Sequence, residues 1–484
     1  MATLALVMPV ALCAGAGLLA ALARGTGFWR WVGVISSVGI LASAVLLSVA
    51  VLAGGHPTAL NGLLAADALS AFMLLVIGCV GLVASWSGFG TGRDWTYGSL
   101  VGLFLAAMSL AVLTDNLGVL LVAIEATTVA TAFLVGHQGS RRSLEAAWKY
   151  VILGSAGIAL AFLGVVLLYT ATLAAEQPTL SWLALASGEV RGLDPSLMRL
   201  AGGLMVLGFA TKVGLAPMHS WLPDAHSQAP APVSGLMSGV LLSVAFYAIL
   251  RVQVVVDEVV GAQFLRGLLI AAGLASLAVA GLLLIRQRDL KRMLAYSSVE
   301  HMGIVALAAA IGGPVAISAA LLHVLGHGLI KSSLFVVSGR ILIAEGTASI
   351  PAIRRLASRR PDLASPFIVG LVALLGLPPF CLFFTEVAIA IAGVQAGLGW
   401  VVAVAALLLL LVFAAIARLG AHMTLGVTGH GAEPEDAGVG LARTGFGRQL
   451  PIVTAFVAAI VAGFAVGPLP ALLDAAGQVL AVRR

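Results

Sequence analysis

The chain has 484 residues, of which 61% are hydrophobic and only 10% are charged. About a quarter of the residues of a typical soluble protein are charged, so this composition excludes a soluble enzyme and indicates a polytopic membrane protein. The net charge of +6 does not indicate nucleic-acid binding, because basic residues in membrane proteins usually mark cytoplasmic loops. Cys13, Cys79 and Cys381 lie in apolar runs without the spacing of metal ligands, so we expect no metal and no cofactor.

Apolar stretches long enough to cross a bilayer recur along the chain, since a spanning helix needs about 20 residues. The first stretch has no basic segment before it, which favours a span over a signal peptide. We therefore predict an all-α polytopic membrane protein with about fourteen transmembrane helices. The expected spans cover residues 3–22, 28–53, 66–89, 98–113, 116–136, 147–170, 199–218, 232–253, 261–285, 292–311, 315–343, 363–394, 398–417 and 450–472.

The distribution of lysine and arginine over the connecting loops predicts an orientation. Eighteen of the 26 basic residues lie in or beside loops that follow odd-numbered spans, six lie on the other side, and Lys212 and Lys331 lie within spans. Because basic loops stay in the cytoplasm, both termini should face outward from a prokaryotic inner (plasma) membrane. The arginines at 354–360 fit this topology signal, and they could also contact lipid headgroups or a soluble partner.

Two spans combine a proline break with a lone ionisable residue. Lys212 is followed by Pro217 in the seventh span, and Pro378 and Pro379 precede Glu386 in the twelfth. A broken helix and a charge both cost energy in hydrocarbon, so each combination indicates a functional position. The two spans are five apart, an odd number, so the halves that contain them run in opposite directions, as in the inverted repeats of transporters.

These inverted halves predict how the chain is divided. Residues 171–198 should form an outer loop that is partly helical near Trp182. The expected parts are an N-terminal three-helix segment at 1–97, a first repeat at 98–253, a second, inverted repeat at 254–418, a cytoplasmic loop at 419–449 and a C-terminal helix at 450–484.

Further ionisable groups lie inside the spans. A proton crosses hydrocarbon only by moving between groups that bind and release it. A buried lysine or a histidine can do so near neutral pH. His323, His327 and Lys331 recur every four residues and so share one helix face. The expected proton relay consists of Glu125, Lys212, His323, His327, Lys331 and Glu386, with Lys149, Glu300 and His301 as further candidates.

Each of these residues also has a structural interpretation. Lys212 could reach the membrane interface, Glu125 could make a packing hydrogen bond, and Glu386 could cap the second half-helix. Lys149 lies near the cytoplasmic edge and could be an anchor. The polar residues after the first break, which are His219, Asp224 and His226, are expected to be structural and to tie their segment to neighbouring helices.

Three motifs together resemble one family. Residues 212–230, 289–298 and 376–386 are similar to the signature of the proton-pumping membrane subunits of respiratory complex I and their antiporter relatives, and the likeness extends over roughly residues 60–470. Within that family, residues 299–303 and 323–333 most resemble component F of hydrogenase-4, a membrane subunit of group 4 hydrogenase and formate hydrogenlyase complexes.

The resemblance implies fourteen helices, two inverted five-helix repeats and a proton half-channel in each. It implies that Glu125 and Lys212 form a pair and that Glu386 is the exit-side group. One position departs from many relatives, because Ser243 stands where they carry a lysine or histidine. The link between the half-channels should then depend on water, on Ser243, or on His323, His327 and Lys331.

The function we expect is proton translocation as a membrane subunit of a redox-driven complex of the hydrogenase-4 type. Its partners would be other membrane subunits, a soluble hydrogenase or redox arm, and the lipid bilayer, but not nucleic acid. Nothing in the chain could hold a redox centre, so any oxidoreductase activity would belong to partners. One alternative is a subunit of a multisubunit Na+/H+ antiporter. Another is a membrane anchor that has lost transport and holds a soluble hydrogenase or carbon-capture module.

Overall fold

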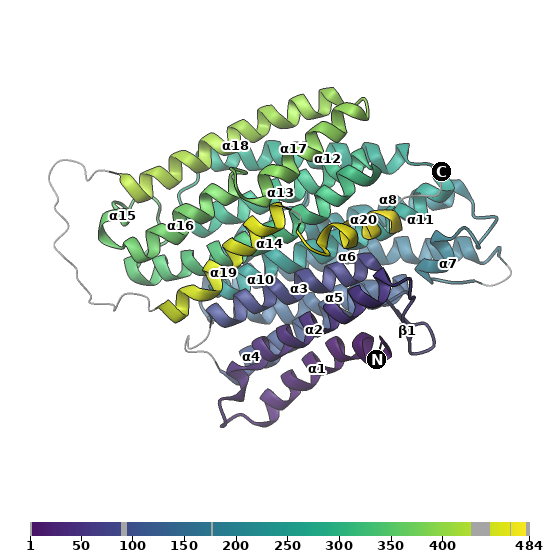
Figure 1. The fold of residues 1–484 in the computed structure, drawn as a ribbon, viewed down its shortest axis with the longest axis horizontal. Coiled ribbons are helices and arrows are strands. Elements are labelled where there is room, and N and C mark those ends of the chain that lie inside the picture. Colours follow the sequence, from purple (N-terminus) through teal and green to yellow (C-terminus); the bar gives the residue numbers. More distant parts are fainter. Residues whose placement is uncertain (1, 89–93, 176–177, 427–445, 465, 481–484) are drawn as a thin grey trace.

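The computed structural model describes residues 2–88, 94–175, 178–426, 446–464 and 466–480 as a bundle of helices that run roughly side by side (Figure 1). Twelve helices in these residues are long and apolar enough to cross a membrane. They correspond to twelve of the fourteen expected spans. The other two expected spans correspond to shorter apolar helices, the pair α16 and α17 and the single helix α19. The predicted all-α polytopic fold is therefore confirmed.

The N-terminal part and the first repeat contain most of the capped helix starts. Asp67, Asp94, Asn116 and Ser140 each accept hydrogen bonds from backbone N–H groups of the helix that follows, which is why these helices begin there. The elements are α1 (Ala2–Leu22), η1 (Phe28–Arg30), α2 (Val32–Leu52), β1 (Thr58–Ala59), β2 (Leu64–Ala65), α3 (Ala68–Ser87), α4 (Trp95–Leu113), α5 (Leu117–Gly136), α6 (Arg141–Thr172), α7 (Trp182–Ala186), α8 (Pro195–Val213), α9 (Trp221–Gln228), α10 (Ala231–Leu236), the π-turn η2 (Met237–Leu241) and α11 (Leu242–Val260).

The second repeat and the C-terminal part supply the most buried helices. Nearly every residue of α13 is inside the bundle, and α14 packs against α3, α13, α16, α17, α19 and α20. The elements are α12 (Gln263–Ile285), α13 (Leu290–Ile311), α14 (Gly313–Glu345), α15 (Leu356–Arg359), α16 (Pro361–Leu374), α17 (Cys381–Gln395), α18 (Gly399–Leu425), α19 (Phe446–Gly463) and α20 (Leu469–Val479).

The first break lies earlier than predicted. Helix α8 ends at Val213 because Gly214 takes the left-handed conformation (φ 76°), so the expected span to residue 218 was wrong at its end. Pro217 follows in a cis peptide bond with Ala216. The polar residues beyond it form the helix α9, with Trp221 and His226 fully buried. Helix α8 alone is long and apolar enough to cross the membrane, and α9 follows it as a separate short helix.

The second break divides the expected span 363–394 into α16 and α17. Helix α16 ends at Leu374, Gly376 has a φ of 62°, and the Pro378–Pro379 bond is cis. Helix α8 starts from the side of the bundle that carries α7, whereas α16 starts from the opposite side, beside α15 (Figure 1). The two broken helices thus run in opposite directions, as predicted from the inverted halves.

Three other boundaries differ from the prediction. Helix α6 begins at Arg141 rather than near residue 147, because Ser140 caps it. Helix α18 extends to Leu425, beyond the expected end at 417, and residues 427–445 of the expected cytoplasmic loop lie outside the described residues. The last expected span, 450–472, was wrong at its end, because α19 stops at Gly463 and α20 is a separate helix packed against α3 and α14.

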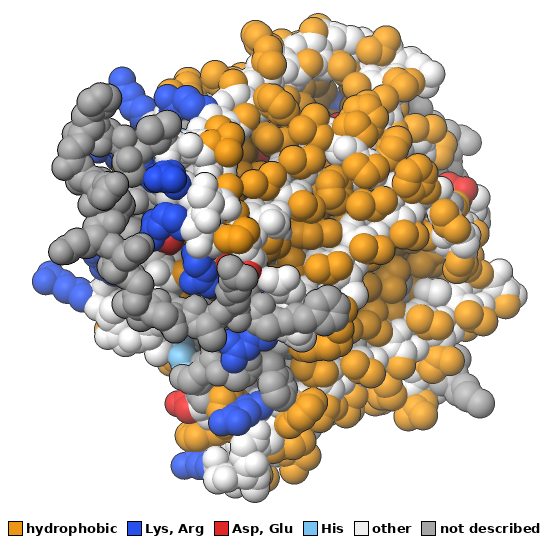
Figure 2. All heavy atoms as spheres, turned by 60° about the vertical axis from the view of Figure 1, so that its left-hand side comes forward, with side chains coloured by type: hydrophobic (Ala, Val, Ile, Leu, Met, Phe, Trp, Pro, Cys, Tyr) orange, Lys and Arg blue, Asp and Glu red, His pale blue; other side chains and the backbone are white. Residues whose placement is uncertain are grey.

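The outer surface has the character of a membrane protein. Hydrophobic side chains cover a broad belt, and lysine and arginine side chains gather beside it (Figure 2). We call this side the basic end. It contains the start of α6, the end of α12 and the start of α13. Ion pairs and backbone hydrogen bonds connect the segments at this end. The opposite side, with β1, β2 and α7, is called the hairpin end.

An internal ion pair closes the hairpin end. The Arg251 guanidinium donates to both carboxylate oxygens of Asp67, at 2.6 and 2.8 Å, and stacks 4.0 Å from the ring centroid of Trp182. Desolvation opposes ionisation of Asp67, but the charge and hydrogen bonds of Arg251 outweigh it and hold the pKa of Asp67 below its usual value. The pair is therefore ionised at neutral pH and joins α3, α7 and α11.

Candidate functional site

The first site is an ion pair between α5 and α8. The Glu125 Oε2 and Lys212 Nζ atoms lie 3.8 Å apart. Thr128 connects them, because Lys212 Nζ donates to its hydroxyl and that hydroxyl donates to Glu125 Oε2 at 2.9 Å. Ser155 of α6 donates to the other carboxylate oxygen at 2.6 Å. This arrangement provides a hydrogen-bonded route between a base and an acid.

The two charges of the first site differ in exposure. Lys212 is fully buried, whereas the Glu125 side chain is 32% exposed on the protein surface. The Tyr150 ring centroid lies 4.8 Å from Lys212 Nζ and supplies a cation–π contact. A Cβ atom at Gly154 would lie 2.8 Å from the same nitrogen. The glycine therefore makes room for the ammonium group, and the site is built for a buried cation.

The second site begins at Lys331 on α14, which is also fully buried. Its Nζ donates to Ser297 Oγ at 2.7 Å and to the Leu294 carbonyl oxygen, both on α13. Glu300, one turn further along α13, is buried and interacts electrostatically with the Lys331 ammonium. Lys331 is thus, like Lys212, a buried lysine coupled to a carboxylate on a neighbouring helix.

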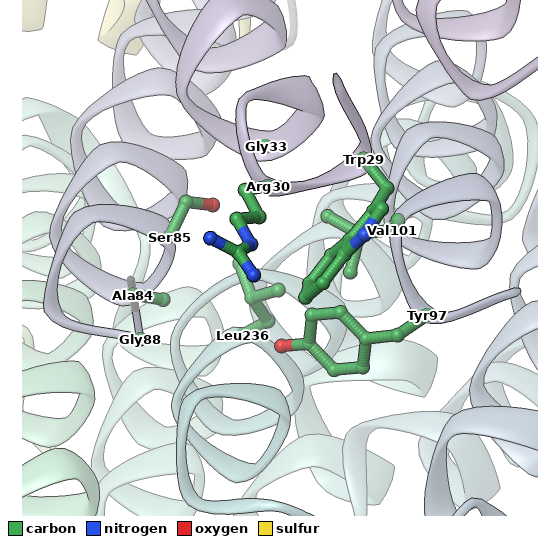
Figure 3. Close-up of a pocket in the computed structure, with 10 residues that line it drawn as sticks. Trp29, Arg30, Gly33, Ala84, Ser85, Gly88, Tyr97, Val101 and Leu236 are labelled. Atoms are coloured by element: carbon green, nitrogen blue, oxygen red, sulfur yellow. The ribbon is translucent and has the colours of Figure 1, made fainter. Parts of the chain in front are cut away.

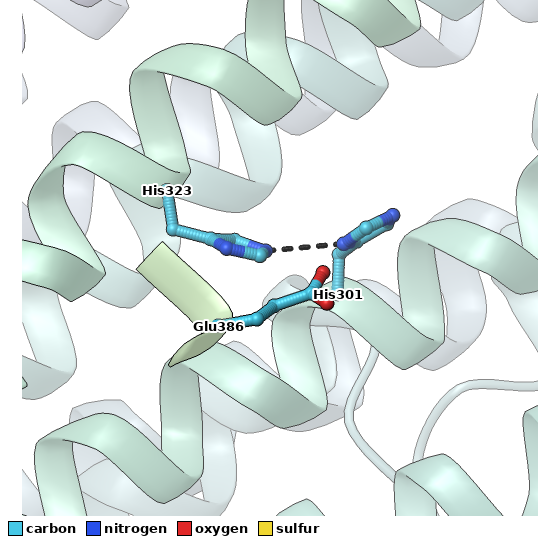
Figure 4. Close-up of side chains that lie close together, drawn as sticks. All are labelled: His301, His323 and Glu386. Atoms are coloured by element: carbon cyan, nitrogen blue, oxygen red, sulfur yellow. Dashed lines mark hydrogen bonds between the residues drawn. The ribbon is translucent and has the colours of Figure 1, made fainter. Parts of the chain in front are cut away.

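Three histidines continue the second site from Lys331 toward Glu386. The His301 Nδ1 and His323 Nε2 atoms lie 3.0 Å apart, with the Glu386 carboxylate beside them (Figure 4). His301 Nε2 lies 3.5 Å from Glu300 Oε2, and the His327 ring centroid lies 5.1 Å from that of His301. Protons can therefore pass from carboxylate to imidazole to imidazole within this set.

The same set is also the candidate for metal binding among the described residues. Ligand atoms of His301, His323 and Glu386 lie within 4.8 Å of one another. The imidazole–imidazole hydrogen bond occupies two of those nitrogens, and His323 Nδ1 lies 2.9 Å from Thr385 Oγ1. These partners suit an imidazole chain that exchanges protons, because both nitrogens of His323 and Nδ1 of His301 face a donor or an acceptor.

His226 of α9 lies between the two sites. It is fully buried, its Nδ1 faces the Leu222 carbonyl oxygen at 2.9 Å, and its Nε2 has no hydrogen-bond partner among the described residues. Rings flank it on both sides: Trp221, at 6.0 Å between centroids, stacks on Tyr150, and Phe335, at 5.7 Å, lies beside Lys331. His226 also interacts electrostatically with Lys331. The sequence indicated only a structural role here.

The remaining predicted residues lie apart from this series. The Ser243 hydroxyl donates to the carbonyl oxygen of Gly239 in its own helix at 3.0 Å and makes no direct hydrogen bond to either lysine among the described residues. Lys149 lies at the basic end, where its Nζ is 2.7 Å from Glu145 and 3.2 Å from Asp224. Asp224 also pairs with Arg292 at 2.8 Å, and His219 Nδ1 is buried without a hydrogen-bond partner among the described residues.

A separate small cavity lies in the N-terminal helices. It has a volume of about 30 Å³, and the side chains of Trp29, Arg30 and Tyr97 line it together with Ser85 and Leu236 (Figure 3). None of the buried ionisable residues described above lines it. The chemistry of the chain is therefore concentrated in the series from Glu125 to Glu386.

Sequence reasoning missed the neutral residues that complete both sites. Thr128 follows Glu125 by three residues, the spacing that places two side chains on one helix face, so this signal was available. Ser297 precedes Glu300 by three residues in the same way. Ser155 and Tyr150 lie on another helix, and only the packing of α5 against α6 brings them to the pair.

Fold and site together define a membrane protein of the antiporter type, with inverted repeats, paired broken helices and a buried series of ionisable groups. Residues 114–412 match the family described as "NADH:quinone oxidoreductase/Mrp antiporter, TM". That match covers more than half of the chain, and the chain belongs to this family.

Individual relatives agree with the family assignment. A "Hydrogenase-4 component F homolog" from Methylacidiphilum infernorum is 42% identical over 293 residues, which are 60% of this chain and 61% of that protein. The chain thus spans about three fifths of that relative. A chain of an archaeal membrane-bound sulfane sulfur reductase superposes with a TM-score of 0.87 at 25% identity, covering 99% of this chain and 97% of the other. A chain of the Mrp complex from Dietzia sp. superposes with a TM-score of 0.85 at 22% identity, covering 99% and 97%. These proteins are membrane subunits of multisubunit complexes.

Proposed function

We propose that the chain translocates protons across the membrane as one subunit of a larger complex. The observation that supports this most directly is the series of ionisable groups from Glu125 to Glu386, most of which are buried inside the bundle. Such groups are costly inside a membrane protein. An anchor would need none of them, so their number argues against the alternative of a scaffold that has lost transport.

The proposed route uses both lysines and the histidine between them. A proton held by Lys212 passes to His226 through water, since no hydrogen bond among the described residues joins the two side chains. His226 can accept it at the free Nε2 atom and passes it toward Lys331. From there Glu300, His301 and His323 carry it to Glu386, and water completes any gap wider than a hydrogen bond.

The energy for this transfer would come from partner subunits. The hydrogenase-4 relative and the sulfane sulfur reductase chain both belong to complexes whose names indicate redox chemistry. We propose a soluble redox arm as a partner, coupled to this chain by conformation and charge. The predicted setting is a prokaryotic plasma membrane with the basic end in the cytoplasm and both termini outside, since lysine and arginine gather at one side.

The decisive experiment replaces the first lysine. Lys212→Ala should abolish proton translocation in inverted membrane vesicles, while the amount of assembled complex on a native gel stays unchanged. Lys212→Met, which keeps most of the side-chain volume, should do the same and separates loss of charge from loss of packing. Unchanged proton uptake in either variant would contradict the proposed route.

A second test concerns the link between the repeats. His226→Phe keeps an aromatic ring of similar size but cannot hold a proton. It should reduce translocation by about a hundredfold, the lower end of the range expected when a proton-transfer group is lost. Ser243→Ala is the matched control on a neighbouring helix and should leave transport unchanged. Transport lost in Ser243→Ala but kept in His226→Phe would move the link to Ser243.

A subunit of a Na+/H+ antiporter remains the second candidate, because the superposition on a chain of the Mrp complex covers almost the whole protein. In that case transport should be driven by a sodium gradient without a redox substrate. Proton movement that requires Na+ on the opposite side of the vesicle would favour the antiporter. Movement that requires only an electron donor and acceptor would favour the redox-driven complex.

A further inference from the structure

An open cavity of about 710 Å³ lies at the basic end, beside the ends of α12 and α18. It is separate from the buried ionisable series, since none of the residues from Glu125 to Glu386 that form that series lines it. Its lining is formed by Ile285, Arg286, Gln287, Arg288, Ile350, Pro351, Arg418, Leu419 and His422.

The lining is strongly basic. It contains three guanidinium groups and no carboxylate, and within the described residues none of these arginines forms an ion pair. His422 Nε2 is buried and has no hydrogen-bond partner in the same part of the chain. Arginine presents a planar set of donors that matches phosphate oxygens, so the cavity is suited to a phosphate group.

A neighbouring cavity of about 570 Å³ provides a contrast. It shares Gln287 and Arg288 with the first, but Asp289 lines it and its Arg292 pairs with Asp224 at 2.8 Å. Its positive charge is therefore partly neutralised from within the protein. Within the described residues, the cavity between α12 and α18 has no such compensation, and a bound anion would supply it.

The helices that lead away from this cavity carry apolar side chains on the bundle surface. Leu282 of α12 is 63% exposed and Leu410 of α18 is 63% exposed. Most of α12 and α18 faces away from the bundle. In the most apolar 18-residue stretch of each helix, only 39% of α12 and 28% of α18 is buried. A free phosphate would gain nothing from these faces, whereas acyl chains attached to the phosphate would cover them.

We propose that this cavity binds the headgroup phosphate of an anionic phospholipid whose acyl chains lie along α12 and α18. The arginines Arg286, Arg288 and Arg418 hold the phosphate, and His422 Nε2 adds a further contact. Basic pockets between membrane helices are suited to such headgroups. The proposal does not depend on proton translocation, because its residues lie outside the proposed route.

The test measures lipid retained by the full chain in the complex with which it is purified. After extraction in mild detergent, mass spectrometry of bound lipid should show phosphatidylglycerol or another anionic phospholipid enriched over phosphatidylcholine. Arg286→Gln with Arg288→Gln should weaken binding of added phosphatidylglycerol by about fivefold for each charge removed. Arg141→Gln, an exposed basic residue of α6 at the same end, is the matched control and should bind like the wild type.

Three outcomes would overturn the proposal: equal retention of phosphatidylglycerol and phosphatidylcholine by the wild type, unchanged binding in the double variant, or an equal loss in Arg141→Gln. Inorganic phosphate that competes as well as the lipid would assign the cavity to a free anion instead. An acidic segment of a partner subunit that crosslinks to position 288 while no lipid is retained would assign it to a protein contact. Arg418→Lys keeps the positive charge near the Ile285 carbonyl oxygen and should retain most of the lipid binding. That result would show that loss of charge, rather than misfolding, explains the weaker lipid binding of the double variant.

Discussion

The two halves of the molecule hold their buried lysines in different ways. Lys212 belongs to a compact site in which one carboxylate and the hydroxyl of Thr128 form its polar surroundings. Lys331 belongs to an extended site, where a carboxylate, three histidines and a second carboxylate follow one another along α13, α14 and α17. Each half therefore contains a lysine and an acid, but only the second contains a chain of imidazoles.

This difference indicates a division of tasks between the halves. In the compact site the distance between one acid and one base controls whether the lysine keeps its proton, because a nearby carboxylate stabilises the ammonium. In the extended site a proton can be held by several groups in turn. Loss of a single group should therefore be severe in the first half and at the lysine of the second, and milder among the histidines.

After the Lys212 variants, the largest effect is expected for Lys331→Met. This change keeps the side-chain volume but removes the group that connects His226 to Glu300, so translocation should fall by at least about a hundredfold. The measurement is the rate of proton uptake by inverted vesicles at equal amounts of assembled complex. A rate within a factor of three of the wild type would show that the two halves do not share one route.

Glu125→Gln should have the next largest effect. The pair lies 3.8 Å apart, and charges at this distance interact by at most about 4 kcal/mol at an effective dielectric constant of 20. Because Glu125 is partly exposed, screening reduces this, and we expect translocation to slow by about tenfold to a hundredfold. Ser155→Ala is the control, since it removes a hydrogen bond to Glu125 but keeps the charge. Equal rates in both variants would remove the charge of Glu125 from the mechanism.

Gly376→Ala tests the space reserved for the acid of the second half. A Cβ atom there would lie 2.5 Å from Glu386 Oε2, and the φ of 62° adds strain. We expect a loss of about 1–2 kcal/mol in stability, the cost of a left-handed residue with a Cβ. Translocation should also fall by about tenfold, since the carboxylate is displaced from the histidines.

Two other glycines make this comparison specific. Gly397 has a φ of 76° and nothing within 4 Å of an added Cβ, so Gly397→Ala should lose stability to the same extent without slowing transport. Gly154→Ala meets only the flexible end of Lys212, at 2.8 Å, and should slow transport less than Gly376→Ala. Similar transport in the Gly376 and Gly397 variants would contradict a role for the position of Glu386.

Hydropathy and proline positions were sufficient to predict the number of spans, the two broken helices and their opposite directions. The exact break was not predictable from Pro217, because the left-handed Gly214 ends α8 first. His226 could not be recognised, since a polar segment after a proline is typical of a loop, and only the packing of α9 inside the bundle buries it. Ser243 was named because relatives carry a lysine or histidine at its position, and its hydroxyl donates to a carbonyl oxygen of its own helix.

The pairing of groups on different helices marks the limit of sequence reasoning here. The four-residue spacing correctly places His323, His327 and Lys331 together on α14, because a single helix determines it. The contact of His301 with His323 depends on how α13 crosses α14, and that of Glu386 with both depends on where α17 resumes after the break. Neither contact follows from a regular spacing of residues along the sequence, because each joins residues on different helices.

The smallest effect is expected for His323→Gln, and it tests whether the imidazole chain of the second half has parallel paths. Glutamine can still hydrogen-bond His301 and Thr385 but cannot carry a proton. Ligand atoms of His301 and Glu386 lie within 4.8 Å of each other, and the His327 ring centroid lies 5.1 Å from that of His301. With both groups near His301 we expect routes that bypass His323, so translocation should fall only about fivefold, the size of one hydrogen bond of about 1 kcal/mol. The double variant His323→Gln with His327→Gln should then fall by far more than the product of the single effects, since residues that share one task are not additive. If His323→Gln alone stopped transport, the second half would have a single path, and the contrast between a compact and an extended site would not hold.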